Sequence, residues 1–273
     1  MKVFKELVPS LIKAELLRNS SFEKLVKNVE VNAPVIVSLT SFGDRINKVD
    51  IAIKSMMQQT YLPEKIILNL HQSYQSKIPK RLKDLVSDLF IINFVEEDSP
   101  HIKLIPTLQN YPDRIIVTVD DDVIYPPNLI ENLFQQHLAF PQEIIANHVR
   151  VIDFLDNGLK PYKAWTFDGE SENPHRYLAL GFGGVLYPVN AFNKEVFNKT
   201  MYLKLAPKAD DLWFKAMSYI NHTDVMPLKN KVKNLYPIVG TQRTSLKTEN
   251  VGQDRNTLQW QALVEHYNIN LKV

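Results

Sequence analysis

Between residues 34 and 139, short apolar runs alternate with segments whose apolar residues recur at helical spacing. The runs are rich in Val, Ile and Leu and are bounded by turn-forming residues, which is typical of buried strands. We expect strands over 34–40, 65–70, 89–95 and 115–119, and helices over 46–59, 79–87, 101–109 and 128–139. Strands that alternate with helices predict an α/β domain, with a mixed, mostly parallel sheet and helices on both faces.

Outside this region the pattern is less regular. Residues 1–28 predict two helical pieces with an apolar stripe, and the alternation weakens after about residue 145. We expect strand-like segments over 144–154, 178–187 and 232–239, helices over 190–197, 210–220 and 254–267, and loops over 156–176 and 240–253.

Composition narrows the class of protein. The chain has 273 residues, of which 45% are hydrophobic and 23% charged, so it can bury a sizeable core. A net charge of +2 gives no reason to expect a nucleic-acid partner, and the lack of cysteine excludes disulfides and thiolate metal sites. The N-terminus has no signal-peptide pattern and no stretch is long and apolar enough to span a bilayer, so we expect a cytoplasmic protein.

The first 28 residues have two possible roles. They hold six Lys/Arg against three Glu, and such a basic amphipathic helix can lie on an anionic membrane surface. The alternative, which we favour, is an ordinary amphipathic helix packed on the domain. Peripheral contact with the inner face of the cell membrane through 1–28 therefore stays open.

Three consecutive acids, Asp120, Asp121 and Asp122, follow the apolar strand 115–119 directly. Like charges this close are costly unless a cation is near, and Mg²⁺ and Mn²⁺ prefer carboxylate and phosphate oxygens. The carboxyl ends of strands are also where open α/β sheets bind ligands. The alternatives are an acidic solvated turn, or a phosphatase-type Asp-x-Asp motif that Ile124 at its fifth position does not fit.

Four further segments can contribute to such a site. Thr40 to Arg45 link a strand to a helix and can present backbone N–H groups to an anion, while Lys103 begins the helix before the acidic strand. Glycines 181, 183 and 184 indicate close approach of a ligand or of another backbone. Asp210 and Asp211 begin a helix beside Trp213 and Phe214; Asp210 is a plausible N-cap, and an acid beside an apolar patch can act as a general base.

The sequence lacks the motifs of several other common kinds of active site. The seven histidines form no His-x-x-x-His pair, which argues against zinc, although His222 stays open as a distant ligand. The glycines form neither a dinucleotide-binding fingerprint nor a Walker loop, and no Ser/His/Asp elbow is present.

The order of these segments resembles the GT-A glycosyltransferases, specifically the family-2-like bacterial enzymes that build surface polysaccharides. The resemblance covers about residues 33–225 and rests on Thr40-Ser-Phe-Gly-Asp-Arg45, Asp120-Asp-Asp122, the Gly-rich segment and Asp210-Asp-Leu-Trp-Phe-Lys215. It implies a metal-dependent, inverting transfer of a sugar from a nucleoside-diphosphate sugar, with UDP preferred, to a hydroxyl of a glycan or lipid-linked glycan. It also implies a helical segment 1–30 before one catalytic domain 31–273, with a nucleotide-sugar half (31–125) and an acceptor half (126–273).

The resemblance assigns roles residue by residue. Catalysis falls to Asp211, the base, with Asp210, and Mn²⁺ or Mg²⁺ to Asp122 with Asp120. Gly183, Gly184 and Trp213 would contact the acceptor, and Trp165 and Tyr187 could extend an apolar platform there, unless they are core residues. The donor-binding residues would be Thr40, Phe42, Arg45, Lys103, Asp120 and Asp121.

One departure from the family pattern affects nucleotide identity. Many relatives carry an acid after the second strand that holds the base, whereas this chain has Leu70-His-Gln-Ser73 there. Two other functions stay open: a metal-dependent phosphoryl or nucleotidyl transferase that uses the same acids, and a non-catalytic carbohydrate- or metal-binding module on the same fold.

Overall fold

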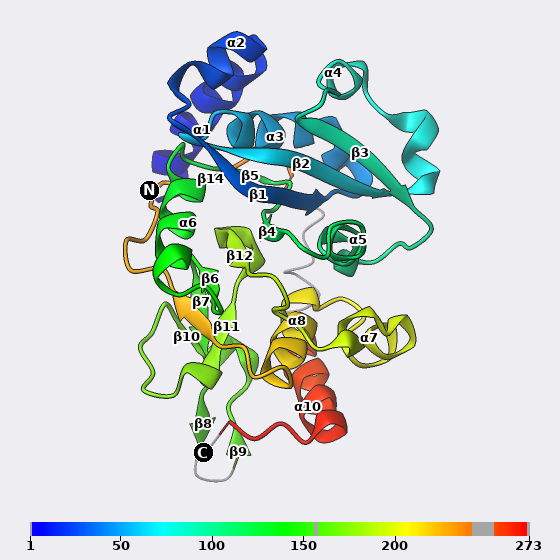
Figure 1. The fold of residues 1–273 in the computed structure, drawn as a ribbon, viewed down its shortest axis with the longest axis vertical. Helices are drawn as coiled ribbons and strands as arrows, with labels where there is room; N and C mark the ends of the chain where they lie inside the picture. Colours follow the sequence, from blue (N-terminus) through cyan, green and yellow to red (C-terminus); the bar gives the residue numbers. More distant parts are fainter. Residues whose placement is uncertain (1, 156–157, 242–253, 272–273) are drawn as a thin grey trace.

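The computed structural model describes residues 2–155, 158–241 and 254–271, with side chains from residue 7 onward. Its centre is a seven-stranded sheet in the order β13-β6-β12-β4-β1-β2-β3 (Figure 1). The strands β1 (Val31–Thr40), β2 (Tyr61–His71), β3 (Phe90–Val95) and β4 (Ile115–Thr118) are parallel to their neighbours within this group. All four strands that the hydrophobic pattern predicts between 34 and 119 are therefore present.

The other side of the sheet mixes directions. β12 (Val185–Tyr187) lies antiparallel between β4 and β6 (Ile144–Ala146), and β13 (Val225–Pro227) pairs in parallel with β6. A separate small sheet has the order β10 (Thr166–Phe167), β7 (Val149–Val151), β11 (Tyr177–Ala179). Two-residue ladders join β14 (Tyr236–Pro237) to β5 (Val123–Ile124) and β8 (Phe154–Leu155) to β9 (Gly158–Leu159).

Helices cover both faces of the parallel strands. α3 (Val49–Met57) and α5 (Ile105–Asn110) lie on opposite faces of the β1–β3 part of the sheet (Figure 1). α6 (Leu129–Ala139) packs on β6 and β12, and α1 (Lys2–Arg18) packs on α3 and β14. In the other half, α7 (Lys199–Leu205) and α8 (Asp210–Tyr219) pack with α10 (Arg255–Tyr267).

Two apolar clusters form the core, one around β1–β3 and α3 and the other around β11, α8 and α10. Val35, Val37 and Leu39 are fully buried on β1, and Trp213 and Trp260 are fully buried in the second cluster. A strand buried on both faces needs a nearly continuous apolar run, which is why the first four strands are visible in the sequence.

Several predicted elements are shorter or divided. The predicted strand 178–187 is interrupted by the 3₁₀ turn η7 (Gly181–Gly183), after which Gly184 has a φ of +89° that only glycine adopts readily. The predicted helix 190–197 is only the 3₁₀ turn η8 (Lys194–Phe197), and α7 follows it unpredicted. Side-chain caps from Asn193 and Asn198 begin η8 and α7 separately, which explains the division.

Other boundaries also differ. The predicted helix 79–87 is reduced to α4 (Lys80–Lys83), and 101–109 begins as the 3₁₀ turn η4 (Pro100–Lys103) before α5. The short helices α2 (Phe22–Leu25) and η1 (Val26–Asn28) follow α1. The expected loop 156–176 contains β9, β10 and two 3₁₀ turns, η5 (Tyr162–Ala164) and η6 (Pro174–Arg176). The expected loop 240–253 lies almost wholly outside the described residues, and no helix among those described could cross a membrane.

Candidate active site

The two acidic segments predicted from the sequence meet around one lysine. Lys103, at the end of η4, places its Nζ 2.7 Å from Asp120 Oδ1 and 3.2 Å from Asp210 Oδ2. The three side chains are 12%, 25% and 13% exposed, so these ion pairs are largely shielded from water. We call Lys103, Asp120, Asp210, Asp211 and Gly181 the Lys103 cluster.

The charge of Lys103 is maintained by its neighbours. Burial alone would lower the pKa of Lys103, but the carboxylates of Asp120, Asp210 and Asp211 raise it well above its ordinary value. The lysine is therefore a permanent positive charge at the carboxyl end of β4, where the resemblance expects a phosphate.

Asp211 is held by the glycine-rich turn. The N–H of Gly181 donates to both carboxylate oxygens of Asp211, at 3.2 and 3.1 Å. Burial, together with the adjacent Asp210 carboxylate, raises the pKa of Asp211 to about 7, against the opposing charge of Lys103. An acid that titrates near neutrality is suited to accept a proton at physiological pH.

Gly181 has no room for a side chain. A Cβ at this position would lie 2.8 Å from Lys103 Nζ and 2.9 Å from Asp211 Oδ1. The glycine is thus required by the approach of the two charged groups, as the sequence suggested for this segment. Asp210 does not cap α8, because Ala209 occupies the N-cap position without a side-chain bond; its carboxylate pairs with Lys103 instead.

A second cluster holds the other two acids. Arg45, which is buried, places its Nη1 2.8 Å from Asp121 Oδ1 and its Nη2 3.0 Å from Asp122 Oδ2. Ser41 donates to Asp121 Oδ2 at 2.6 Å, and the Nε of Arg45 donates to the carbonyl of Thr241. We call Arg45, Ser41, Asp121 and Asp122 the Arg45 cluster. A guanidinium that bridges two carboxylates fixes the loop after β4.

This loop is also held through its backbone. The N–H of Ile238, next to β14, donates to the carbonyl of Asp122 at 2.7 Å. The Tyr125 hydroxyl accepts from the N–H of Asp120 at 2.8 Å and donates to the carbonyl of Phe182 at 2.9 Å. Tyr125 therefore connects the acidic loop to the glycine-rich turn. The sequence does not predict this role, because a tyrosine before two prolines can equally well be an ordinary core residue.

A buried row of polar side chains positions Lys103. Ser38 on β1 donates to the carbonyl of Lys103 at 2.5 Å and lies 2.6 Å from the hydroxyl of Thr107. Asn69 on β2 donates to both hydroxyls and accepts from Asn93 on β3. Buried polar groups are retained where they are mutually satisfied, and here they fix η4 and α5 on the sheet.

The donor residues proposed from the resemblance occupy this same edge. Thr40 ends β1, and its hydroxyl donates to the carbonyl of Asn69 at 2.8 Å. Phe42 is half-buried, with the Arg45 guanidinium 5.0 Å from its ring centroid. Arg45 contacts the acids directly, so any contact with a phosphate would compete with those ion pairs.

The proposed acceptor residues lie inside the protein. Trp213 is 0% exposed, and its indole N–H donates to the carbonyl of Val196. Gly183 and Gly184 are buried, and a Cβ on them would lie 2.9 Å from His148 Cδ2 and from Leu129 Cδ2, respectively. The glycines thus serve packing, and Trp213 presents no face to an acceptor. Trp165 and Tyr187 are also buried, at 2% and 3% exposure, so a platform of these side chains does not fit the structure.

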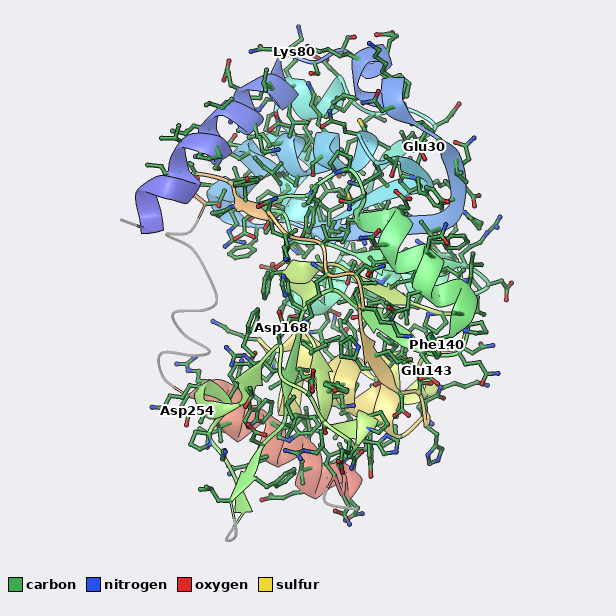
Figure 2. All side chains as sticks on the ribbon, turned by 90° about the vertical axis from the view of Figure 1, so that its left-hand side faces the viewer. Glu30, Lys80, Phe140, Glu143, Asp168 and Asp254 are labelled. Atoms are coloured by element: carbon green, nitrogen blue, oxygen red, sulfur yellow. The ribbon has the colours of Figure 1, made fainter. Side chains whose placement is uncertain are left out.

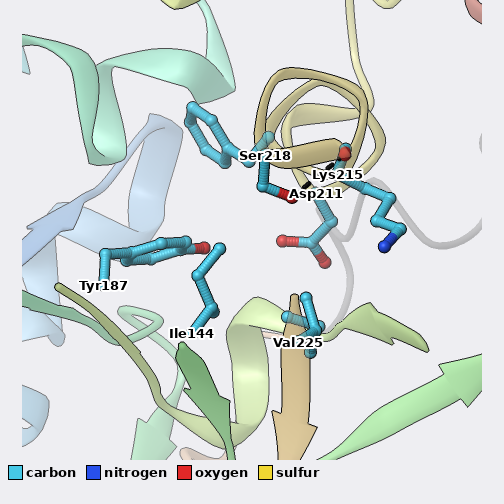
Figure 3. Close-up of a pocket in the computed structure, with 8 residues that line it drawn as sticks. Ile144, Tyr187, Asp211, Lys215, Ser218 and Val225 are labelled. Atoms are coloured by element: carbon cyan, nitrogen blue, oxygen red, sulfur yellow. Dashed lines mark hydrogen bonds between the residues drawn. The ribbon is translucent and has the colours of Figure 1, made fainter. Parts of the chain in front are cut away.

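A small cavity lies behind Asp211. Its volume is about 10 Å³, which leaves room for a single water molecule. Figure 3 shows the Asp211 carboxylate directed between Tyr187 and Val225, while the amine of Lys215 points to one side. Burial lowers the pKa of Lys215 to about 8, partly opposed by Asp224, and within the described protein its Nζ has no hydrogen-bond partner. The cavity is far too small for a sugar or a nucleotide.

The structure contains no ready-made metal cage among the residues it describes. Asp120 and Asp122 are ion-paired with Lys103 and Arg45, respectively, so a Mg²⁺ held by these carboxylates and by substrate phosphates would have to share or displace those ion pairs. His222 is exposed and lies beyond the C-terminal end of α8, which rises about 12 Å from Asp211 to Tyr219, so it does not fit as a ligand of that metal.

Comparisons with known proteins bear on the fold. No protein-family description matches the chain, and neither does any curated protein sequence. The solved 4-diphosphocytidyl-2C-methyl-D-erythritol synthase from Anaerococcus prevotii is 10% identical, with a TM-score of 0.46 over 86% of this chain and 98% of that one. Residues 1–349 of S. aureus TarS are 10% identical, with a TM-score of 0.50 over 88% of this chain and 67% of that one. The chain has a GT-A-type α/β fold. At this identity the likeness shows the fold alone and confirms the predicted architecture.

Proposed function

We propose that this protein is an inverting glycosyltransferase that moves a sugar from a nucleoside-diphosphate sugar to a hydroxyl of a glycan acceptor. The observation that supports this most is the convergence of Asp120 and Asp211, ninety-one positions apart, on Lys103 at the carboxyl end of β4. A permanent cation beside a carboxylate that titrates near neutrality provides both the charge stabilisation and the proton acceptor that this reaction needs.

In the proposed reaction Asp211 acts as the general base. The acceptor oxygen attacks the anomeric carbon, its proton passes to a carboxylate oxygen of Asp211, and the bond from that carbon to the phosphate oxygen breaks. The bond electrons leave with the nucleoside diphosphate. A single base opposite the leaving group implies one in-line displacement and inversion at the anomeric carbon.

The leaving diphosphate gains negative charge as it departs. Lys103 can offset part of that charge, because its Nζ lies at the strand end where the phosphates are expected. When bound, Mn²⁺ or Mg²⁺ would supply Lewis-acid stabilisation of the diphosphate, held by Asp122 with Asp120. UDP is our preferred nucleotide and a glycan of a bacterial surface polysaccharide our preferred acceptor, both on the resemblance described above.

The direct test is turnover of a panel of nucleotide sugars with Mn²⁺, for the wild type and for Asp211→Asn. Asn is nearly isosteric but cannot accept the proton, so we expect turnover to fall by at least about 100-fold. Asp113→Asn, on the surface loop before β4, is the matched control and should keep wild-type activity. Wild-type turnover in Asp211→Asn would refute the role of Asp211 as base.

The products decide between this proposal and its rivals. A glycosyltransferase releases a nucleoside diphosphate, whereas a nucleotidyl or phosphoryl transferase releases pyrophosphate or inorganic phosphate. A sugar that binds tightly but is never turned over, under any metal, would indicate a non-catalytic binding module instead.

A further inference from the structure

The helix α1 turns apolar side chains away from the protein. Between residues 7 and 18 six side chains are exposed, and four of these are large aliphatic groups with 50% to 58% exposure: Val8, Leu11, Ile12 and Leu16. A surface helix ordinarily turns its polar residues outward, and single exposed apolar residues need no explanation. Four on one short helix form a patch, and such a patch indicates a surface that binds a partner.

The four side chains lie on one side of the helix. At 3.6 residues per turn, positions 8, 11, 12 and 16 fall within an arc of about 140°. Glu15 falls within the same arc, and its carboxylate accepts a hydrogen bond from Asn19 at 2.7 Å. We call Val8, Leu11, Ile12 and Leu16 the apolar stripe.

The opposite side of α1 is held on the domain. Ala14 and Leu17 are buried where the helix packs on α3 and β14. The Nζ of Lys54 on α3 donates to the carbonyl of Arg18, the last residue of α1, at 2.8 Å. Figure 2 shows α1, in the blue of the N-terminal residues, along the outer edge of the half that holds β1–β3. The apolar stripe is therefore presented outward by a helix whose other face is already packed.

The charge of the same segment is complementary to an anionic surface. Residues 1–28 hold six Lys/Arg against three Glu, whereas the other 245 residues hold 26 Lys/Arg against 27 Asp/Glu. The excess positive charge of the chain is thus concentrated in the segment that carries the apolar stripe, where Lys13, Lys24 and Lys27 are exposed. An apolar helix face accompanied by basic residues is typical of helices that lie in the interface of an anionic bilayer.

A second copy of the chain is less complementary to the apolar stripe. Two stripes packed against each other would bring together two segments that each have three more basic than acidic residues. Like charges at close range repel, whereas lipid phosphates would meet these lysines with opposite charge. The charge of the segment therefore favours an anionic bilayer over self-association.

We infer that α1 docks the protein on an anionic membrane surface, with the apolar stripe inserted at the boundary between headgroups and acyl chains. The helix lies along the surface, because its inner face stays packed on α3 and β14. The inference does not depend on the proposed reaction, since it rests on the exposure and charge of residues outside the candidate active site.

Docking through α1 would also position the candidate active site. The hydroxyl of Ser10 on α1 donates to the carbonyl of Pro237 on β14, and the N–H of the next residue, Ile238, donates to the carbonyl of Asp122 at 2.7 Å. One short segment thus connects the docking helix to the loop of the three acids. A protein bound through α1 would hold that loop at a fixed place relative to the bilayer.

The experiment is co-sedimentation of the full chain with vesicles of equal parts phosphatidylglycerol and phosphatidylcholine, and with vesicles of phosphatidylcholine alone. The wild type should bind the anionic vesicles at least about tenfold more tightly, because the basic residues of 1–28 attract charged headgroups. The double variant Ile12→Gln/Leu16→Gln should bind the anionic vesicles at least about tenfold more weakly than wild type, because two apolar side chains no longer enter the bilayer. The matched control is Leu138→Gln/Leu258→Gln, which replaces two similarly exposed leucines (62% and 64%) on α6 and α10 and should stay within about twofold of wild type.

Thermal unfolding checks that each variant is folded, and Val8→Gln/Leu11→Gln is a second pair on the same stripe if the first pair lowers Tm. The inference is overturned if the wild type does not sediment with the anionic vesicles, if it binds both kinds of vesicle equally, or if the stripe variants bind as well as the control. Sedimentation velocity without lipid tests the second copy. A wild-type dimer that Ile12→Gln/Leu16→Gln dissociates would show that the stripe is an interface between chains, and would overturn the inference as well.

Discussion

Replacing Lys103 by methionine tests the electrostatic core of the site. Methionine has a similar length and volume but no charge, so Lys103→Met leaves Asp120, Asp210 and Asp211 close together without their cation. At an effective dielectric constant of about 20, unit charges at the observed 2.7 and 3.2 Å attract by about 6 and about 5 kcal/mol. Desolvation of the lysine opposes much of this attraction.

The net cost is therefore smaller than the attractions suggest. Removing one partner of a buried ion pair typically costs about 3–5 kcal/mol, because the other charge is left uncompensated. Asp120 is 25% exposed and can recover some hydration, so we expect a loss of about 3 kcal/mol in the free energy of unfolding at pH 8.

The pH dependence separates this reasoning from a packing defect. Lys103 opposes the rise in the pKa of Asp211, so its loss raises that pKa further; the penalty is complete at high pH, where the acids are ionised, and is relieved as the pH falls and protons bind. Urea unfolding should show a loss at pH 5.5 that is less than about half of the loss at pH 8. Lys204→Met, at an exposed lysine on α7, should change stability by at most about 0.5 kcal/mol. An equal loss at both pH values, or none at pH 8, would refute the reasoning.

Three further predictions concern the candidate active site. Gly181→Ala should lower Tm and reduce turnover by up to about 100-fold, because the added Cβ displaces the buried ends of Lys103 and Asp211 from the ion pairs and hydrogen bonds that hold them; wild-type turnover would contradict this. The kcat/KM of the wild type should rise as pH increases through about 7, where Asp211 loses its proton, and an acid limb near pH 4 would argue against Asp211 as base. Turnover should be abolished by EDTA and restored by Mn²⁺ or Mg²⁺, whereas full activity in EDTA would exclude a role for Asp122 in metal binding.

The sequence predicts the first half of the fold well; in the second half it predicts α8 and α10, at 210–220 and 254–267, but not the arrangement of the short strands. The four parallel strands are buried on both faces, so each appears as a continuous apolar run. β12 and β14 lie within the predicted strand-like segments 178–187 and 232–239 but have only three and two residues, and the three-residue β13 was not predicted because so short a strand shows no hydrophobic period. Their pairing depends on residues more than thirty positions away, and no local pattern specifies it.

Some residues of the candidate site could be predicted from the sequence and others could not. Asp120, Lys103 and Asp211 could be chosen from the sequence because they follow an apolar strand, begin a helix before that strand, or begin a helix beside aromatic residues. Their partners Ser41 and Tyr125 were not, because a hydroxyl in a turn or beside a proline is common and only its hydrogen bonds distinguish it. The metal and substrate roles of these residues stay predictions.

The charge balance of the two clusters supports a cation-dependent donor. The Lys103 and Arg45 clusters together contain five carboxyl groups but only two basic side chains, so the site is net negative once the acids ionise. A nucleoside diphosphate is itself an anion, and its approach to such a site is unfavourable unless positive charge arrives with it. Burial also raises the pKa of Asp121 to about 7, so a proton on Asp121 would lessen the repulsion and leave Asp211 free to act as the base, whereas a proton on Asp211 would remove the base. Even with that proton the five carboxyl groups outnumber the two basic side chains, so a divalent cation that arrives with the diphosphate, as we propose, would lower the remaining repulsion and leave Asp211 ionised.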